Sequence, residues 1–270
     1  MTMMQALKGA NSSIVLQIYG LTDPEIITLL QKKQADGVVV TIFYDKNATR
    51  NLPKSLNAYP VKSQGLMHRK ILVIDSVQVF LGTANFTTQS LKMHDNLIAG
   101  IWDPLLARFF EESIEDAKTF DIGNATISSF LRPDLKQLCQ VIDEAKESIQ
   151  IAMFTLTHPQ IVQKLIDAIS RGVVVTLAVD RYTAAGASQS AVLRLKEAGA
   201  EILVSQGSQL LHHKWAWIDR EIFVIGSANW TSSAFEKNLD CLLILKGLNT
   251  EQKKLLNRLW KRVAIASEKK

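Results

Sequence analysis

An internal repeat constrains the fold of this chain more than any other feature of its sequence. Each copy follows the pattern His-x-Lys, four residues, Asp, six residues, and then Gly-Thr-x-Asn or Gly-Ser-x-Asn. The residues are His68, Lys70, Asp75, Thr83 and Asn85 in the first copy, and His212, Lys214, Asp219, Ser227 and Asn229 in the second. Because all the gaps are equal, chance recurrence is very improbable, and the pattern indicates an intramolecular duplication.

The repeat extends beyond these residues. Residues 13–24 match residues 148–159, and residues 37–41 match residues 172–176, both at an offset of 135. The His-x-Lys copies are offset by 144, so the second half carries nine additional residues between these points. We therefore expect an α/β fold with two similar lobes.

Each repeat is predicted to open with a β-strand, at about 13–19 and 148–154. A second, Val-rich strand follows at about 38–44 and 173–179. The continuous apolar runs of this second strand predict that it is covered on both faces.

A helix is predicted between the two strands of each repeat, because Pro24 and Pro159 are suited to a first helical turn and Gly37 and Gly172 to the end of a helix. The second repeat adds a predicted helix and strand between residues 188 and 205.

The middle of the chain predicts the junction between the lobes. Asp103-Pro104 begins a helix expected to reach about Lys118, whose apolar face is formed by Leu105, Leu106, Phe109, Phe110 and Ile114. The polar residues 121–128 are the expected junction, and a helix begins near Pro133. The sequence thus predicts a first lobe at residues 1–122 and a second at 123–270.

The repeated side chains suit phosphate chemistry. Because side chains alternate along a strand, His212 and Lys214 share one face, whereas Trp215 and Trp217 are expected on the opposite face, in the core. Gly-Ser-x-Asn indicates a turn whose backbone N–H groups and Asn side chain can face an anion. Two copies brought together place two Lys, two Asn and two hydroxyl groups around two imidazoles.

Such a site can break a phosphodiester without a metal or other cofactor. One His attacks phosphorus and the other protonates the leaving oxygen, because histidine can be neutral or charged near pH 7. The second His then deprotonates the incoming water or alcohol. Lys and Asn stabilise charge on the non-bridging oxygens.

The two copies resemble the paired HKD motifs of the phospholipase D superfamily, and the resemblance covers most of the chain. It implies a two-lobed α/β fold with pseudo-twofold symmetry, a covalent phosphohistidine and no metal cofactor. The superfamily includes phospholipases D, cardiolipin synthases and hydrolases, nucleases and DNA-repair phosphodiesterases. The motif therefore specifies the reaction better than the substrate.

The resemblance also implies an acidic residue that holds the catalytic His through its other ring nitrogen. Asp240 lies 28 residues after His212, but the residue 28 after His68 is Asn96. We therefore expect Asp240 to support His212 and the weaker acceptor Asn96 to support His68. In relatives the N-terminal His is usually the nucleophile; the Asn96 departure leaves the two roles open here.

Other chemistry-bearing residues are expected to be structural. Asp75 and Asp219 are predicted to fix the hairpin between motif strands, and His213 lies on the opposite strand face. His94 and His158 are predicted to be loop or cap residues. A zinc site at His212 and His213 is disfavoured, because adjacent strand positions diverge. The other notable side chains are Cys139 and Cys241, which are predicted to be core residues.

The charge distribution informs the choice of partner. The formal net charge is +5, and residues 251–270 alone contain seven Lys or Arg and two Asp or Glu. The body is therefore balanced, which weakens the case for nucleic acid. Residues 251–266 predict a basic amphipathic helix, packed on its lobe in preference to a membrane-surface or phosphate-backbone role.

No run approaches the roughly 18–20 apolar residues of a membrane span, and the start lacks the order of a signal peptide, so the sequence as given predicts a soluble protein. Residues 1–10 correspond to the end of a repeat element. This leaves open a preceding signal or anchor segment, with secretion or membrane association as the consequence.

Three functions follow from the sequence. Phospholipase D-type hydrolysis or transphosphatidylation of a phospholipid is the first, and a nuclease acting on DNA or RNA is the second. An inactive lipid- or nucleic-acid-binding scaffold is the third, with Asn96 as the one feature in its favour. Because both motifs lie in one chain, a monomer is expected to form a complete site.

Overall fold

The structure is a computed structural model that describes residues 2–269. The elements of the first repeat are α1 (Met3–Gly9), β1 (Ser13–Ile18), α2 (Pro24–Ala35), β2 (Val39–Tyr44), β3 (Ala58–Pro60), β4 (Lys70–Ile74), β5 (Gln78–Gly82), α3 (Thr88–Met93), β6 (His94–Asp95), β7 (Ile98–Trp102) and α4 (Pro104–Glu112).

The chain continues through the second repeat. Its elements are β8 (Ala117–Ile122), β9 (Ala125–Phe130), α5 (Leu135–Asp143), β10 (Ser148–Met153), α6 (Pro159–Ser170), β11 (Val174–Val179), α7 (Arg181–Ala185), α8 (Gln189–Glu197), β12 (Glu201–Ser205), β13 (Leu210–Leu211), β14 (Lys214–Ile218), β15 (Ile222–Gly226), α9 (Ser232–Glu236), β16 (Leu242–Lys246), α10 (Thr250–Ile265) and β17 (Ser267–Lys269).

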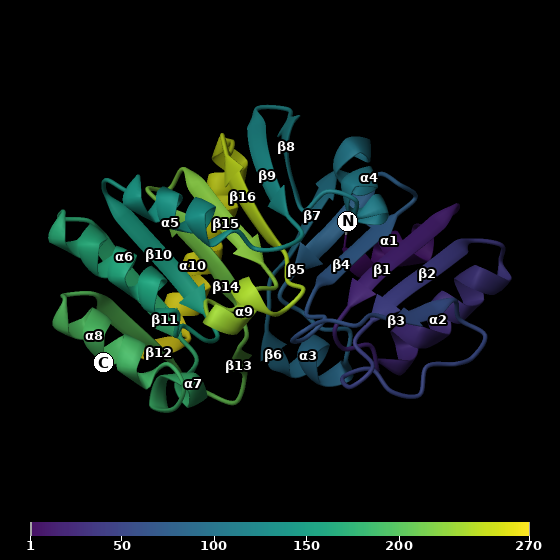
Figure 1. The fold of residues 1–270 in the computed structure, drawn as a ribbon, viewed down its shortest axis with the longest axis horizontal. Coiled ribbons are helices and arrows are strands. Elements are labelled where there is room, and N and C mark those ends of the chain that lie inside the picture. The colour runs from purple at the N-terminus through teal and green to yellow at the C-terminus, as the bar shows by residue number, and fades with distance from the viewer. Residues whose placement is uncertain (1, 270) are drawn as a thin grey trace.

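Two mixed sheets lie side by side (Figure 1). The first has the strand order β3-β2-β1-β4-β5-β7, and the second has the order β17-β12-β11-β10-β14-β15-β16-β9-β8. Helices α5, α6 and α8 cover one face of the second sheet, and α10 lies behind it in the view of Figure 1. A two-stranded pairing of β13 with β6 links the two repeats.

The strand registers confirm the duplication. Strand β1 pairs in parallel with β2 and antiparallel with β4, and β10 does the same with β11 and β14. Lys70 pairs with Ile18, and Lys214 pairs with Met153. Met153 lies 135 positions after Ile18, which is the offset of the repeat. The expected two-lobed α/β architecture is therefore present, with each motif strand beside the first strand of its repeat.

Local sequence signals explain these elements. Asp23 caps α2 by accepting hydrogen bonds from the backbone N–H groups of Glu25 and Ile26, and Pro24 occupies the first turn. Gly37 (φ 91°) and Gly172 (φ 93°) follow the ends of α2 and α6 in a conformation that glycine adopts without a steric cost.

The apolar core has three parts. Each lobe has an outer core beneath its own helices. A third core lies between the lobes, where Ile71 and Leu81 of the first sheet join Trp215, Trp217 and Ile225 of the second. Trp215 and Trp217 are thus core residues, as expected, and burial of both sheets in one apolar cluster holds the two motifs in a fixed relation.

Asp75 and Asp219 fix the motif hairpins to the start of each repeat. Asp219 accepts hydrogen bonds from the backbone N–H groups of Lys146, Glu147 and Ser148, all at 2.8 Å. Asp75 accepts equivalent bonds from residues 11–13. Both Asp residues have φ near +50°, in the hairpin turn. This geometry agrees with their expected structural role.

The helix expected from Asp103 to about Lys118 is shorter than predicted. Helix α4 ends at Glu112, because Ser113 adopts a left-handed conformation and its hydroxyl donates a hydrogen bond to the carbonyl of Phe110. Ile114, expected on the apolar face, is 79% exposed. Leu105, placed on the same face, is 65% exposed, whereas Leu106, Phe109 and Phe110 are buried. The predicted apolar face is therefore confirmed at these three positions and wrong at Leu105 and Ile114.

The polar stretch at residues 121–128 is not a linker. It lies within a hairpin in which β8 pairs with β9, and β9 pairs with β16 of the second sheet. The turn at Gly123-Asn124, with Gly123 at φ 61°, was the missed signal. The division at residues 122/123 stays a prediction, and the sheet pairing favours placing residues 117–130 with the second lobe.

Strand β2 also differs from expectation. Only alternate residues, Val40 and Ile42, are buried, whereas β11 is buried from Val175 to Val179. Helix α10 runs over sixteen residues and supplies Val263 to the apolar cluster that contains Ala178 of β11. Helix α4 of the first repeat has nine residues and packs against β4 and β5.

Helix α10 packs on the second lobe, as expected. Leu256, Trp260 and Val263 are buried, and the Trp260 ring lies 5.9 Å from that of Trp215. Within residues 2–269, no helix has both the length and the apolar character that a membrane crossing requires.

Candidate active site

The two motifs meet because each lobe pairs with a segment of the other just before its motif His. The backbone N–H of His68 donates to the carbonyl of Leu239 at 2.7 Å. The N–H of His212 donates to the carbonyl of Asp95 at 2.9 Å. The backbone of His68 is therefore bonded to the residue before Asp240, and the backbone of His212 is bonded to the residue before Asn96.

The imidazole partners are exchanged between the repeats. His68 Nδ1 lies 2.7 Å from Asp240 Oδ1, and His212 Nδ1 lies 2.9 Å from Asn96 Oδ1. The expectation that Asp240 supports His212 and Asn96 supports His68 is therefore wrong. Equal spacing along the chain indicated a partner within the same repeat, but the lobes cross over at the site.

The hydrogen bonds of Asn96 establish which nitrogen of His212 carries a proton. Asn96 Nδ2 donates to the carbonyl of Ser90 at 2.8 Å, which identifies Oδ1 as the atom facing His212. His212 Nδ1 must then donate. Asp240 likewise requires a donor at Nδ1 of His68. In the neutral rings, Nε2 of both His residues therefore carries the free lone pair.

The motif hydroxyl groups support these acceptors rather than line a phosphate site. Thr83 donates to Asn96 Oδ1 at 2.9 Å, and Ser227 donates to Asp240 Oδ1 at 2.6 Å. Both residues are completely buried. The expectation that they surround the substrate with the lysines is corrected by this geometry, since their hydroxyl protons are already used behind the imidazoles.

The motif lysines lie beside their own His residues. Lys70 Nζ donates to the carbonyl of His68 at 2.6 Å, and Lys214 Nζ donates to that of His212 at 3.0 Å. Lys70 lies 5.1 Å from the ring centroid of Tyr19, and burial lowers its pKa to about 7. Burial, followed by the charge of Lys70, holds the pKa of Lys214 well below its ordinary value. Neither ammonium has a carboxylate partner within salt-bridge distance among the described residues.

Burial and positive charge keep both imidazoles neutral. Burial, followed by the charge of Lys70, lowers the pKa of His68. Burial, followed by the charges of Lys214 and Lys70, holds the pKa of His212 well below its ordinary value. Burial alone would raise the pKa of Asp240, but its interactions with His68, Lys70 and Ser227 together outweigh this effect and lower the pKa to about 2. The site thus combines neutral imidazoles with one carboxylate, and binding of an anion would offset the cost of charging its lysines.

Asn85 and Asn229 lie in the turns that follow β5 and β15. Their Oδ1 atoms are buried and have no hydrogen-bond partner within the described part of the chain. Since a buried polar atom without a partner costs free energy, these two acceptors are available to a donor on a bound group or to water.

Sequence reasoning missed two pairs of residues that shape the site. Asp45 Oδ2 accepts from the N–H of Met67, and Asp180 Oδ2 accepts from the N–H of Leu211, in each case just before the motif His. Tyr19 and Phe154 lie against His68 and His212 at ring-centroid distances of 5.1 and 5.0 Å. Asp45 and Asp180, and likewise Tyr19 and Phe154, occupy equivalent positions of the repeat at the offset of 135. The extended repeat could therefore have identified them.

His94 is also closer to the site than expected. His94 is the C-cap residue of α3, which agrees with the predicted loop or cap position, and its ring centroid also lies 5.6 Å from that of His212. His213 is completely buried, with Nε2 3.1 Å from Asp95 Oδ2, in agreement with a structural role. His158 is at the N-cap position of α6. Within residues 2–269, no group of three or more His, Cys, Asp or Glu is arranged to hold a metal ion.

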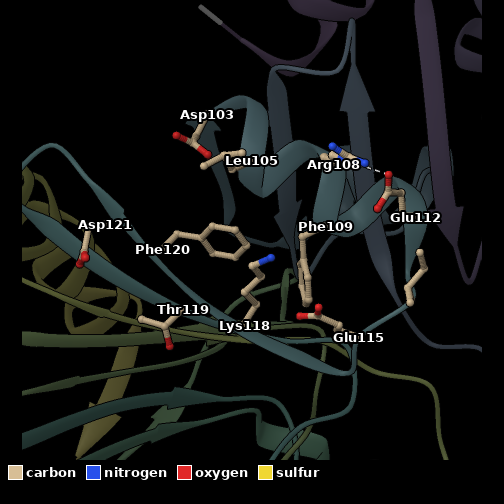
Figure 2. Close-up of a pocket in the computed structure, with 11 residues that line it drawn as sticks. Asp103, Leu105, Arg108, Phe109, Glu112, Glu115, Lys118, Thr119, Phe120 and Asp121 are labelled. Atoms are coloured by element: carbon tan, nitrogen blue, oxygen red, sulfur yellow. Dashed lines mark hydrogen bonds and ion pairs between the residues drawn. The ribbon is translucent and has the colours of Figure 1, made fainter.

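A different pocket, of about 420 Å³, lies between α4 and β8 (Figure 2). Phe109 and Phe120 point into it, and Arg108 and Glu112 pair at its edge. None of its lining residues belongs to either motif, so it is separate from the site described above.

Comparison with known families agrees with this geometry. The family described as "Cardiolipin synthase, PLD-like domain" matches residues 3–117 and 138–262. The chain belongs to the phospholipase D-like family. Both family matches contain a motif, so the two repeats are two phospholipase D-like regions.

Individual relatives of this phospholipase D-like chain have names that refer to a phospholipid, cardiolipin. It is 30% identical over 131 residues to mouse mitochondrial cardiolipin hydrolase, an alignment that covers 47% of this chain and 58% of the relative. It is 23% identical over 296 residues to cardiolipin synthase A of Pseudomonas syringae pv. syringae, with 89% and 61% covered. The chain thus spans less than two thirds of the length of these relatives.

The fold resembles that of a solved phosphatidylserine synthase from Haemophilus influenzae. The TM-score is 0.76 at 13% identity, over 98% of this chain and 84% of the synthase. At this identity, the likeness establishes the shared two-lobed phospholipase D-like fold.

Proposed function

We propose that the protein is a phosphodiesterase that acts through a covalent phosphohistidine, and that His68 is the nucleophile. The observation that carries this assignment is the buried hydrogen bond between His68 and Asp240. It keeps the Nδ1 proton on the neutral ring and leaves the Nε2 lone pair free to attack. The exchanged partners support this assignment of the two roles, which the sequence left open.

In the first step, His68 Nε2 forms a bond to phosphorus as the bond to the leaving oxygen breaks. The His68 ring becomes cationic, and the ionised Asp240 stabilises it, since its pKa is about 2. His212 donates a proton from Nε2 to the leaving oxygen. The bound phosphodiester anion raises the pKa of His212 in the complex, which allows it to carry that proton.

In the second step, His212 Nε2 accepts a proton from water or an alcohol whose oxygen attacks phosphorus. The P–N bond breaks and neutral His68 is restored. Asn96 is uncharged, so it stabilises protonated His212 less than a carboxylate would. His212 donates a proton in the first step and accepts one in the second, so neither its protonated form nor its neutral form should be strongly favoured.

Lys70, Lys214, Asn85 and Asn229 are proposed to bind the non-bridging phosphate oxygens. The two ammonium groups supply positive charge in a buried environment, where electrostatic interactions are stronger than in water. The Asn side chains offer N–H donors. In this mechanism the metal-independent chemistry comes from side chains alone.

A phospholipid is the substrate that we propose. The relatives named above support it, and so do exposed apolar side chains beside the site: Met93 (57% exposed) precedes His94, Tyr182 (63%) follows Asp180 by two residues, and Leu66 (38%) precedes His68 by two. Apolar side chains near an active site suit an acyl chain better than a nucleic-acid backbone.

A parallel turnover assay in EDTA tests this function. Wild type and the His212→Ala variant are offered anionic and zwitterionic phospholipid vesicles beside single- and double-stranded DNA. We expect wild type to release phosphatidic acid or head group, or to transfer the phosphatidyl group to added alcohol, and the variant to lose this activity. Variant-sensitive cleavage of DNA alone would identify a nuclease instead, and no turnover of either substrate would favour the scaffold.

A further inference from the structure

A basic pocket lies against the proposed active site. It has a volume of about 430 Å³, and its lining residues are Lys62, Ser63, Gln64, Arg132, Lys237 and Leu239. Three of these six residues are cationic and none is acidic. A pocket with this composition favours an anion.

The pocket shares a wall with the His68 side of the active site. The carbonyl of Leu239 accepts the backbone N–H of His68 at 2.7 Å, and the next residue, Asp240, holds the His68 imidazole. The Lys62 side of the pocket is fixed to the Lys237 side, because the N–H of Gly65 donates to the carbonyl of Lys237 at 3.0 Å. The two lysines are therefore presented on backbone whose position is tied to the nucleophile.

The positive charge of the pocket is not neutralised by the protein. Within residues 2–269, neither Lys62 nor Lys237 makes an ion pair. Arg132 has one contact, between Nε and Asp116 Oδ1 at 3.5 Å, and both side chains are more than half exposed. An exposed pair of this kind contributes little free energy, so all three cations are available to a ligand.

The pseudo-twofold symmetry shows that this charge is specific to one side. At the offset of 144, Lys62 corresponds to Gln206, and Lys237 corresponds to Met93. Strand register supports the first match, because Pro60 pairs with Tyr44 as Val204 pairs with Val179. The basic pocket is therefore found on the His68 side, and the equivalent place on the His212 side has the exposed Met93 where the His68 side has Lys237.

We infer that Lys62, Lys237 and Arg132 form a subsite for a second phosphate of the same substrate molecule. The inference rests on the proposed function and names its substrate class, a phospholipid with two phosphodiesters joined through a glycerol. One phosphodiester reacts at His68 while the other binds in the basic pocket. An amphiphile with two anionic groups fits a basic pocket near exposed apolar side chains, such as Leu66 and Met93, better than a polyanion does.

The test compares cardiolipin, which has two phosphodiesters, with phosphatidylglycerol, which has a single phosphodiester. Both lipids contain a glycerol head group. Both are presented at low mole fraction in micelles of a neutral detergent, with the total phosphate held equal, so that surface charge is similar. The test variant is Lys62→Gln/Lys237→Gln. The matched control is Lys32→Gln/Lys261→Gln, which removes two charges from exposed lysines outside the pocket.

We expect the test variant to raise KM for cardiolipin about tenfold with little change in kcat, because each exposed lysine–phosphate contact is modest. Its constants for phosphatidylglycerol should equal those of wild type, and the control variant should match wild type on both lipids.

An equal loss on both lipids, or the same loss in the control, would overturn the subsite while leaving the proposed function intact. A loss confined to DNA cleavage would also overturn it. If wild type cleaves neither lipid, it is the proposed function that fails.

Discussion

His68 and Asp240 belong to different repeats, 172 residues apart in sequence, and their side chains are joined by a buried hydrogen bond of 2.7 Å. The corresponding bond on the other side joins His212 to Asn96 at 2.9 Å. The two imidazoles therefore have unequal acceptors, one charged and one neutral. This difference accounts for their different proposed roles.

Asp240→Asn tests the charged acceptor. We expect kcat/KM to fall by about 10–100-fold, because the cationic phosphohistidine loses its carboxylate. Stopped-flow measurement of the first step should show that its formation is slowed.

The reciprocal Asn96→Asp variant is the matched control. It should raise the pKa of His212 and move the pH dependence of that residue upward, without the same loss in the first step. A larger effect of Asn96→Asp than of Asp240→Asn on the first step would contradict the assignment of His68 as nucleophile.

Lys70 predicts a pH limit on activity. Its pKa in the free protein is about 7, so its positive charge is lost as the pH rises through that value. We expect kcat/KM, which reports the free enzyme, to decline above about pH 7. A bound phosphodiester raises the pKa of Lys70, so kcat should persist to higher pH. Values of kcat/KM that stay constant from pH 7 to 9 would contradict this prediction.

The same lysine predicts a pH dependence of stability. The unfolded Lys70 has a pKa of about 10.4, so between about pH 7 and 10 the unfolded chain binds more protons than the folded chain. The free energy of unfolding should therefore rise with pH in this window, on the order of 1 kcal/mol per pH unit. In urea titrations, Lys70→Met should reduce this slope. An unchanged slope would show that Lys70 is not the cause.

Asp219→Ala should destabilise the protein by about 2–3 kcal/mol, because three backbone N–H groups lose a charged acceptor. Asp219→Asn retains one oxygen acceptor and tolerates φ 50°, so its loss should be smaller. Urea unfolding measures both values. Activity well below the unfolding midpoint should be unchanged, and a large fall in kcat in the Asn variant would indicate a role in the site.

The duplication made much of the fold predictable. Two strands and a helix in each repeat are present near their expected positions, because Pro24, Pro159, Gly37 and Gly172 carry local conformational signals. The same reasoning failed after Glu112. There, Ser113 ends the helix and the following residues pair with a strand, and such pairing depends on tertiary structure more than on local propensity.

The site was predictable in composition and less so in its connections. The spacing identified both His and both Lys residues that come together, and the residues at 96 and 240 that hold the rings. It did not reveal that these partners are exchanged, because a pairing between lobes leaves no periodic trace in the sequence. His94 likewise reaches His212 only through the pairing of β6 with β13.

The central claim is a covalent intermediate on His68, and the most direct measurement uses bis(p-nitrophenyl) phosphate. Its good leaving group needs little acid assistance in the first step, whereas hydrolysis of the intermediate still needs His212 as a base. In His212→Ala we predict a burst of one p-nitrophenolate per chain, with the phosphoryl adduct on the peptide containing His68 by mass spectrometry. His68→Ala should show no burst and no adduct. An adduct on His212 in His68→Ala, or turnover in that variant, would contradict the account.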